Sequence, residues 1–280
     1  MSNKSNVVGL PPGSLVYKGP KRKHTTELSL IRYNKEIHEF STFNIEDYKH
    51  TSNTVDWIDI NGIHDEILVE KIGAIFNLHP LLLEDVMDTN QRPSIEEHGE
   101  YTFLKLKMLS YNKVKNHIEH EQVSLVLGHD FVISFQEKPG DIFEPLRKRI
   151  EGGRGKIRGK KSDYLFYAII DIIVDNYFTI IEEIGIDIDR LENEVFEDPD
   201  QKILQKIQRN KKQLLILRKS IYPMREVIAK IQKQEYKLIQ TDNLKYFNDL
   251  YDNVIHIIDA LESYRDINSG LKDFQLPLNL

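Results

Sequence analysis

The chain contains no cysteine, so disulfide bonds and thiolate metal ligands are both excluded. A cysteine-free chain suits a reducing compartment, and the sequence therefore predicts a cytoplasmic location. The N-terminus has no apolar run of signal-peptide length. These observations exclude disulfide-stabilised secreted folds and zinc sites with cysteine ligands.

Long hydrophobic runs and excess basic charge are also missing. A bilayer span needs about 20 predominantly apolar residues, whereas the most apolar stretch, residues 168–174, is interrupted by Asp171. The sequence as given predicts a soluble polypeptide with no transmembrane segment.

Lys and Arg number 38 against 44 Asp and Glu, for a net charge of −6. This balance argues against nucleic acid as the main partner, because phosphate backbones require a basic surface.

What the chain does contain is enough apolar residues, 40% of the total, for one large domain or two modest ones. Residues 1–24 carry Pro11, Pro12, Gly13 and a basic patch, and are expected to form a flexible arm. Residues 25–160 show a mixed α/β pattern, and residues 161–280 are helical. Alternating or β-branched runs predict strands at 27–33, 55–60, 101–110, 122–127 and 131–135, the last two joined by a turn at 128–130.

Shorter helices are predicted within the α/β region at 64–77 and 79–88. The second of these has Pro80 in its first turn, a favoured position for proline. A further helix follows Gly140, with Asp141 as its expected N-cap. Three glycines among residues 152–155, followed by a basic run to Lys161, predict a solvated linker.

Two long helices are predicted to form an antiparallel hairpin after residue 161. The first covers 163–197, the second ends near 234, and Asp198 and Pro199 begin the second after a reversal. Residues 182–200 hold nine acids and one base, whereas residues 206–233 hold nine bases and one acid. Facing charges would give the hairpin an electrostatic register, although two ordinary solvated faces explain any single pair equally well.

The third long helix, predicted at 242–273, carries two apolar stripes. The first has the 3–4 spacing of a coiled-coil seam and consists of Leu244, Phe247, Tyr251, Val254, Ile258 and Leu261. The second consists of Leu250, Ile257, Tyr264 and Leu271. Packing within one chain explains one stripe, and the presence of both suggests oligomerisation.

Catalytic motifs are weak. No serine stands in a nucleophile-elbow context and no HExxH zinc motif occurs. His117 and His120 are close in sequence but lack a nearby third ligand, so a solvated turn competes with a zinc site. A soluble metal-dependent hydrolase using Asp171 and Asp175 is an alternative that lacks a converging nucleophile or base.

Carboxylates on apolar helices are the more informative candidates. Glu84 and Asp85 follow three leucines, and Asp171 and Asp175 share one helix face. The third long helix contributes further polar groups: Asp249, Asp252, Asn253, His256 and Asp259. Acids in apolar surroundings are costly unless paired, hydrated or bound to metal. Oxygen ligands favour Mg2+ or Ca2+ over softer metals. The competing explanation for Asp171 is a buried salt bridge, and for Asp249 it is a solvent-facing coiled-coil position. A purely structural coiled-coil oligomer, in which the acids are only solvated, is a further alternative.

Several sequence blocks, in this order, resemble the CorA family of Mg2+/Co2+ (divalent cation) transporters. The matching blocks are VDWIDINGIHD (55–65), HPLLLEDVMDTNQRPSIEE (79–97), EQVSLVLGHDFVISFQEKPGDIFEPLRKRI (121–150), KKSDYLFYAIIDIIVDNYF (160–178), LRKSIYPMREV (217–227), YFNDLYDNVI (246–255) and LESYRDINSGL (261–271). The resemblance covers roughly residues 10–271.

The resemblance implies an α/β fold in which an α/β/α sandwich domain is followed by long antiparallel helices and a long stalk helix. It implies a cytoplasmic homopentamer that senses Mg2+, with Co2+ or Ca2+ as possible substitutes, and that is not an enzyme. Asp85 would face Asp249 of a neighbouring subunit across a shared ion, and Glu84 and Asp171 would contribute to a second ion. Family members often carry a histidine where Asn253 stands, so this chain departs from the family pattern at the second ion site.

The family pattern continues into a pore-lining helix and a Gly-Met-Asn signature. Neither is expected here: no Gly-Met-Asn occurs, and Pro277 would break a stalk. The sequence therefore predicts a sensing domain that lacks the pore, cannot transport alone, and would meet a membrane only through missing C-terminal helices. A regulatory domain of a zinc-transporting relative is the nearest alternative.

Overall fold

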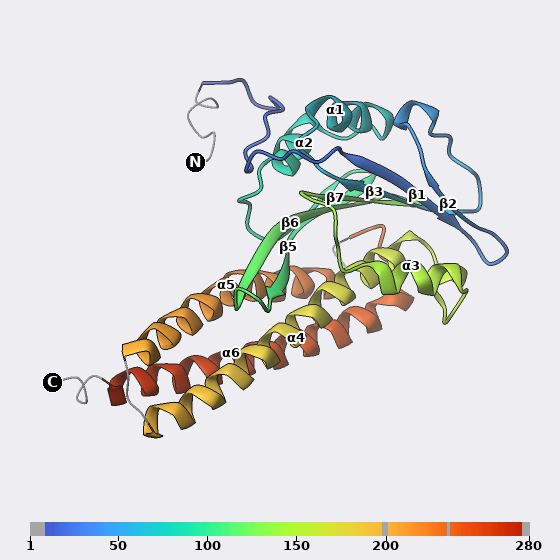
Figure 1. The fold of residues 1–280 in the computed structure, drawn as a ribbon. Coiled ribbons are helices and arrows are strands. Elements are labelled where there is room, and N and C mark those ends of the chain that lie inside the picture. The colour runs from blue at the N-terminus through green and yellow to red at the C-terminus, as the bar shows by residue number, and fades with distance from the viewer. Residues whose placement is uncertain (1–8, 198–200, 234–235, 276–280) are drawn as a thin grey trace.

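The computed structural model describes residues 9–197, 201–233 and 236–275, and their arrangement is a layered α/β fold (Figure 1). The reversal predicted with Asp198 and Pro199, and the break predicted at Pro277, lie outside these residues. A seven-stranded mixed sheet forms the middle layer, in the order β2-β1-β3-β7-β6-β5-β4. Its strands are β1 (Glu27–Tyr33), β2 (His38–Thr42), β3 (Val55–Asn61), β4 (Ser94–His98), β5 (Tyr101–Asn112), β6 (His117–Leu127) and β7 (Phe131–Gln136).

Helices cover both faces of this sheet. The short helices α1 (Glu66–Ile75) and α2 (Pro80–Met87) lie on one face, and the long helices lie beyond the other (Figure 1). The long helices are α4 (Ser162–Glu197), α5 (Gln201–Gln232) and α6 (Leu244–Gln275), and α3 (Glu144–Glu151) precedes them. The predicted α/β/α sandwich followed by long helices is therefore confirmed.

Strand β3 shows how one segment serves both cores. It pairs antiparallel to β1 and parallel to β7, and all but its last residue are buried. Because side chains alternate across a strand, Trp57 enters the core beneath the long helices while Ile58 and Ile60 enter the core under α1 and α2. The core on the long-helix side runs without interruption from the sheet into α4, α5 and α6.

Local signals define the ends of the short helices. The side chain of Asp65 accepts a hydrogen bond from the Leu68 N–H at 3.0 Å and caps α1. His79 caps α2 through its ring, which accepts from the Leu81 N–H at 3.2 Å, and Pro80 follows at the first helical position. The expected cap of α3 is wrong by two residues. Asp141 accepts from the Phe143 N–H, while Phe143 occupies the cap position without a side-chain bond.

Segments expected to be irregular make specific contacts. Gly13, Tyr17 and Lys18 from the expected N-terminal arm are hydrogen-bonded to α1 or α2, and the Lys18 N–H donates to the Met87 carbonyl at 3.0 Å. The expected solvated linker is corrected in part, since it contains a short 3-10 helix at Ile157–Gly159 with Ile157 buried. The domain divisions near residues 24 and 160 stay predictions.

The two apolar stripes of α6 pack within one chain. Leu250 and Ile257 of the second stripe are as completely buried as Phe247 and Val254 of the first, and α6 lies against both α4 and α5. Two neighbouring helices of the same chain account for both stripes, so the stripes do not require oligomerisation, which stays a prediction. The predicted charge register is weak: among the described residues one ion pair, Lys206–Glu194 at 2.5 Å, joins α4 to α5.

The segment Ser162–Val195 of α4 is, by length and composition, apolar enough to cross a membrane. Helices in the core of soluble proteins meet the same criterion, and 61% of the most apolar window is buried inside this fold. No other helix within the described residues meets it.

Candidate metal centre

The first pair of predicted ligands lies on α2, where each acid already has a partner. The Glu84 carboxylate accepts a hydrogen bond from the Gly13 N–H at 2.9 Å and one from the Lys18 ammonium at 3.3 Å. These contacts connect residues about 70 positions apart in sequence. The N-terminal segment therefore occupies both oxygens of Glu84 in the isolated chain.

Asp85 is held by a different cation. Its carboxylate forms an ion pair with Lys105 of β5, whose side chain is only 6% exposed. The backbone carbonyl of Asp85 accepts from the Gln122 side-chain amide at 3.3 Å. One third of the Asp85 side chain remains exposed, so the carboxylate can still be approached from solvent.

The second pair lies among a group of acids on the long helices. Asp171, half-buried on α4, has a pKa raised to about 6, first because of burial and then because of repulsion from Asp175. A hydrogen bond with Tyr167 lowers this pKa, and Asp249 of α6 raises it further. The pKa of Asp175 is also raised, by burial and by Asp249. Three carboxylates thus share a patch in which the positive charge of Arg149 lowers the pKa values of Asp171 and Asp175 without cancelling their rise.

The four predicted ligands do not come together within one chain. Glu84 and Asp85 belong to the helix layer on one sheet face, whereas Asp171 and Asp249 belong to the long helices beyond the other (Figure 1). Across the described residues, no group of three or more His, Asp or Glu side chains could hold a metal ion. A site built from all four acids therefore requires a second subunit, and the pairing of Asp85 with Asp249 stays a prediction.

The chemistry of these groups fits a hard divalent cation. All four candidates offer carboxylate oxygens, which Mg2+, Co2+ and Ca2+ accept as ligands. The pKa of Asp171 is raised first by burial and then by repulsion from Asp175, and a bound cation would favour its ionised form. At the other pair, Lys18 and Lys105 supply the compensating charge in the isolated chain, so a metal ion would compete with these ammonium groups.

Other sequence candidates take different positions. Asn253 and Asp249 are one helical turn apart on α6. His117 and His120 are three residues apart on strand β6 and therefore point to opposite faces of the sheet, which is incompatible with a shared zinc ion. Sequence reasoning missed Lys105, although a lysine within the apolar run YTFLKLKMLS was a usable signal.

Comparison with known proteins identifies the family of the chain. A family model described as CorA-like Mg2+ transporter protein matches residues 52–276. The cobalt/magnesium transport protein CorA of Thermotoga maritima is 44% identical over 271 residues, which cover 96% of this chain and 77% of that protein.

Solved structures share the fold. The soluble domain of CorA from Methanocaldococcus jannaschii has a TM-score of 0.74 at 19% identity, covering 89% of this chain and 97% of that structure. The cytoplasmic domain of ZntB from Vibrio parahaemolyticus has a TM-score of 0.68 at 15% identity, over 88% and 96% of the two chains. At these identities the likeness extends to the fold alone.

Proposed function

Because the chain belongs to the CorA-like Mg2+ transporter family, we propose that it is the cytoplasmic, divalent-cation-sensing part of a magnesium and cobalt transporter. The family is one of transporters and not of enzymes, which removes the hydrolase alternative. The observation that carries the proposal is the 44% identity to a cobalt/magnesium transport protein across 96% of the chain.

In the proposed assembly, five copies surround a common axis. Asp85 of one subunit and Asp249 of the next bind one Mg2+ ion, and Glu84 and Asp171 contribute to a second. Two facing carboxylates repel each other by a few kcal/mol at intermediate effective dielectric. A divalent ion between them replaces repulsion with attraction, so ion occupancy stabilises the closed, symmetric arrangement selectively.

The partners of these acids in the isolated chain support a sensing role over a permanent structural site. Lys105 and Lys18 neutralise Asp85 and Glu84 when no ion is present. An incoming ion must displace these contacts, which weakens its binding and makes occupancy responsive to concentration. When the internal concentration of the ion falls, Lys105 and Lys18 pair again with Asp85 and Glu84, and the interface loses its bound ions.

The test measures assembly against ion concentration. The mass of the full 280-residue chain is followed by light scattering while Mg2+, Co2+, Zn2+ or Ca2+ is titrated from zero. We expect Mg2+ and Co2+ to favour a pentamer and to increase thermal stability. Asp85→Asn and Asp249→Asn should each shift the Mg2+ midpoint upward by about tenfold, since each removes one charged ligand.

The matched control is Asp259→Asn, which removes an exposed carboxylate from the same helix as Asp249. This variant should assemble as the parent does. Assembly that ignores all four ions, or ligand variants that behave like Asp259→Asn, would contradict the proposal. Strong selectivity for Zn2+ would favour the zinc-transporting alternative.

A further inference from the structure

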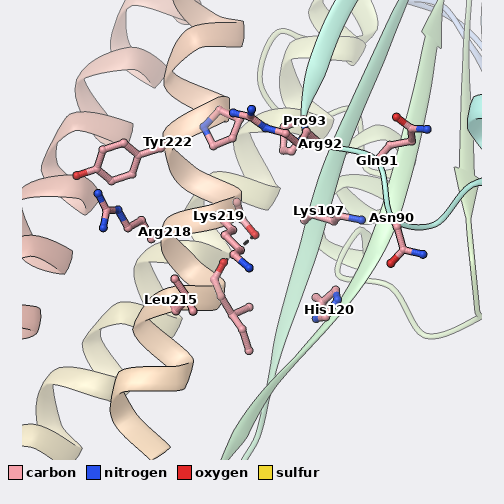
Figure 2. Close-up of a pocket in the computed structure, with 13 residues that line it drawn as sticks. Asn90, Gln91, Arg92, Pro93, Lys107, His120, Leu215, Arg218, Lys219 and Tyr222 are labelled. Atoms are coloured by element: carbon pink, nitrogen blue, oxygen red, sulfur yellow. Dashed lines mark hydrogen bonds between the residues drawn. The ribbon is translucent and has the colours of Figure 1, made fainter. Parts of the chain in front are cut away.

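A separate cavity of about 750 Å³ lies between α5 and the sheet, and basic side chains dominate its charge (Figure 2). Arg92 comes from the loop after α2, Lys107 and His120 come from β5 and β6, and Arg218 and Lys219 come from α5. Among the described residues that line it there is no Asp or Glu. The volume lies within the range of small-molecule sites.

Lys107 is the most unusual of these groups. Burial lowers the pKa of its ammonium, and the ammonium donates to two neutral oxygens, the Thr89 carbonyl at 2.7 Å and the Gln122 amide at 3.2 Å. Within the described part of the chain, no carboxylate lies within ion-pair distance of it. An ammonium has three protons to donate, so one remains for a ligand in the cavity. The more distant carboxylates of Glu137 and Asp88 offset the cost of burying this ammonium only in part, and an anion in the cavity would relieve the rest.

Two more cations flank Lys107. Arg92 extends from its loop toward α5, and Lys219 lies on α5 across the cavity (Figure 2). Both are exposed, and neither has an ion-pair partner within the described residues. Arg218 lines the same wall, with its guanidinium carbon 5.2 Å from the centre of the Tyr222 ring. Arg92, Lys107 and Lys219, which form no ion pair with any described residue, thus border one cavity from three different elements.

We propose that this cavity binds a small anion carrying two or more phosphate groups, held by Arg92, Lys107 and Lys219. Guanidinium and ammonium groups are the side chains that bind phosphate oxygens in charge-assisted hydrogen bonds. Because Arg92 and Lys219 lie on opposite sides of the cavity, a chain of phosphates offers charged oxygens to both. Apolar lining from Leu215 and Pro223 leaves room for an organic group attached to the phosphates.

The experiment is calorimetric titration of the full chain, without divalent ions, by two probes. Inorganic tripolyphosphate supplies phosphate groups alone, and ATP adds an organic group to the same phosphates. We expect one probe molecule per chain, with binding that weakens as salt increases. Equal binding of both probes would support recognition of phosphate alone, and tighter binding of ATP would support a nucleotide.

The variant for this test is the double substitution Arg92→Ala with Lys219→Ala, because both residues are exposed and their removal leaves the core intact. Affinity should fall by about tenfold or more. The control is Lys71→Ala with Lys148→Ala, which removes the same charge from α1 and α3, outside the cavity. The proposal would be overturned if neither probe binds, or if both double variants lose affinity equally.

This site uses none of the four acids proposed to bind Mg2+. Failure of ion-dependent assembly would leave the expected phosphate binding unchanged, and failure of phosphate binding would leave the metal proposal unchanged. The two outcomes are therefore distinguishable in the same protein preparation.

Discussion

The ammonium of Lys105 is paired with the carboxylate of Asp85, the residue proposed to bridge an ion to a neighbouring subunit. Lys105 extends from the central part of β5 and is almost fully buried, so it lies behind the carboxylate while solvent reaches Asp85 from outside. Glu96 lies 3.7 Å from the same ammonium. Lys105 would therefore compete with the cation that Asp85 is proposed to bind.

Replacing Lys105 by methionine should increase divalent-ion affinity, because the competing positive charge is removed while the buried volume is kept. We expect the Mg2+ midpoint of assembly to fall by about tenfold. Light scattering during a Mg2+ titration measures this midpoint. Lys71→Met, which removes the exposed partner of Glu46, is the control and should leave the midpoint unchanged. A midpoint for Lys105→Met equal to or above that of the parent would contradict the competition.

The acidic patch on α4 and α6 should destabilise the chain when no ion is present. Asp171→Asn removes one repelling charge but keeps an oxygen that can accept from Tyr167. Without divalent ions, the free energy of unfolding at pH 7.5 should rise by on the order of 1 kcal/mol. Urea denaturation measures the change. Asp252→Asn, which alters an exposed acid on α6, should have little effect. An unchanged free energy of unfolding for Asp171→Asn would show that burial and repulsion of this charge cost little.

Glu121 predicts a dependence of stability on pH. Burial raises its pKa to about 8, and repulsion by Glu137 adds to this while Lys138 opposes it. Between pH 4.5 and pH 8 the unfolded chain has lost this proton and the folded chain keeps it, so stability falls as pH rises; above pH 8 this contribution is constant.

Glu121→Gln should remove this dependence. Its advantage in unfolding free energy over the parent should grow from pH 5 to pH 8.5, reaching on the order of a few kcal/mol. Urea denaturation at both pH values provides the comparison. Glu144→Gln, which alters an exposed acid on α3, serves as the control. An advantage of the same size at both pH values would contradict the assignment.

Arg147 neutralises two acids near Trp57. It donates to Asp59 at 2.6 Å and to Asp141 at 2.8 Å, and the Asp59 side chain is fully buried. Arg147→Met leaves that buried charge unpaired, so the free energy of unfolding should fall by roughly 3–5 kcal/mol. Chemical denaturation measures the loss. Lys148→Met, at the neighbouring exposed position, should change stability by less than about 0.5 kcal/mol. Similar stability of the two variants would exclude a structural role for the network.

The sequence predicted strongly patterned elements well. Strands β1 and β3 and the long helices α4 and α6 begin and end within a few residues of their predicted positions. Strand β2 was missed because HEFST is mostly exposed at the sheet edge and lacks the alternation that marks a half-buried strand. The short strand β4, SIEEH, was missed for a similar reason, since only Ile95 among its residues is buried.

Candidate ligands were identified by residue type, whereas their partners were not. Nothing local to Glu84 predicts a bond from Gly13, because 71 positions separate the two residues. Lys105 and Asp85 likewise meet only because β5 runs beneath α2 in the folded sheet. The apolar stripes of α6 predicted burial correctly but not what buries them, since the same periodicity serves a neighbour in the same chain or in another.

The sequence by itself determined the class of protein, the order of its elements and the acids available to a hard cation. These follow from local patterns and from motif blocks that occur in a fixed order. The tertiary structure alone decided which charges meet: it divides the four acids between two sides of the sheet and supplies Asp85 with a buried lysine. It also leaves Lys107 facing a cavity with no carboxylate of the described residues within ion-pair distance. Electrostatic partners are set by distance in space, and that distance exists only once the chain has folded.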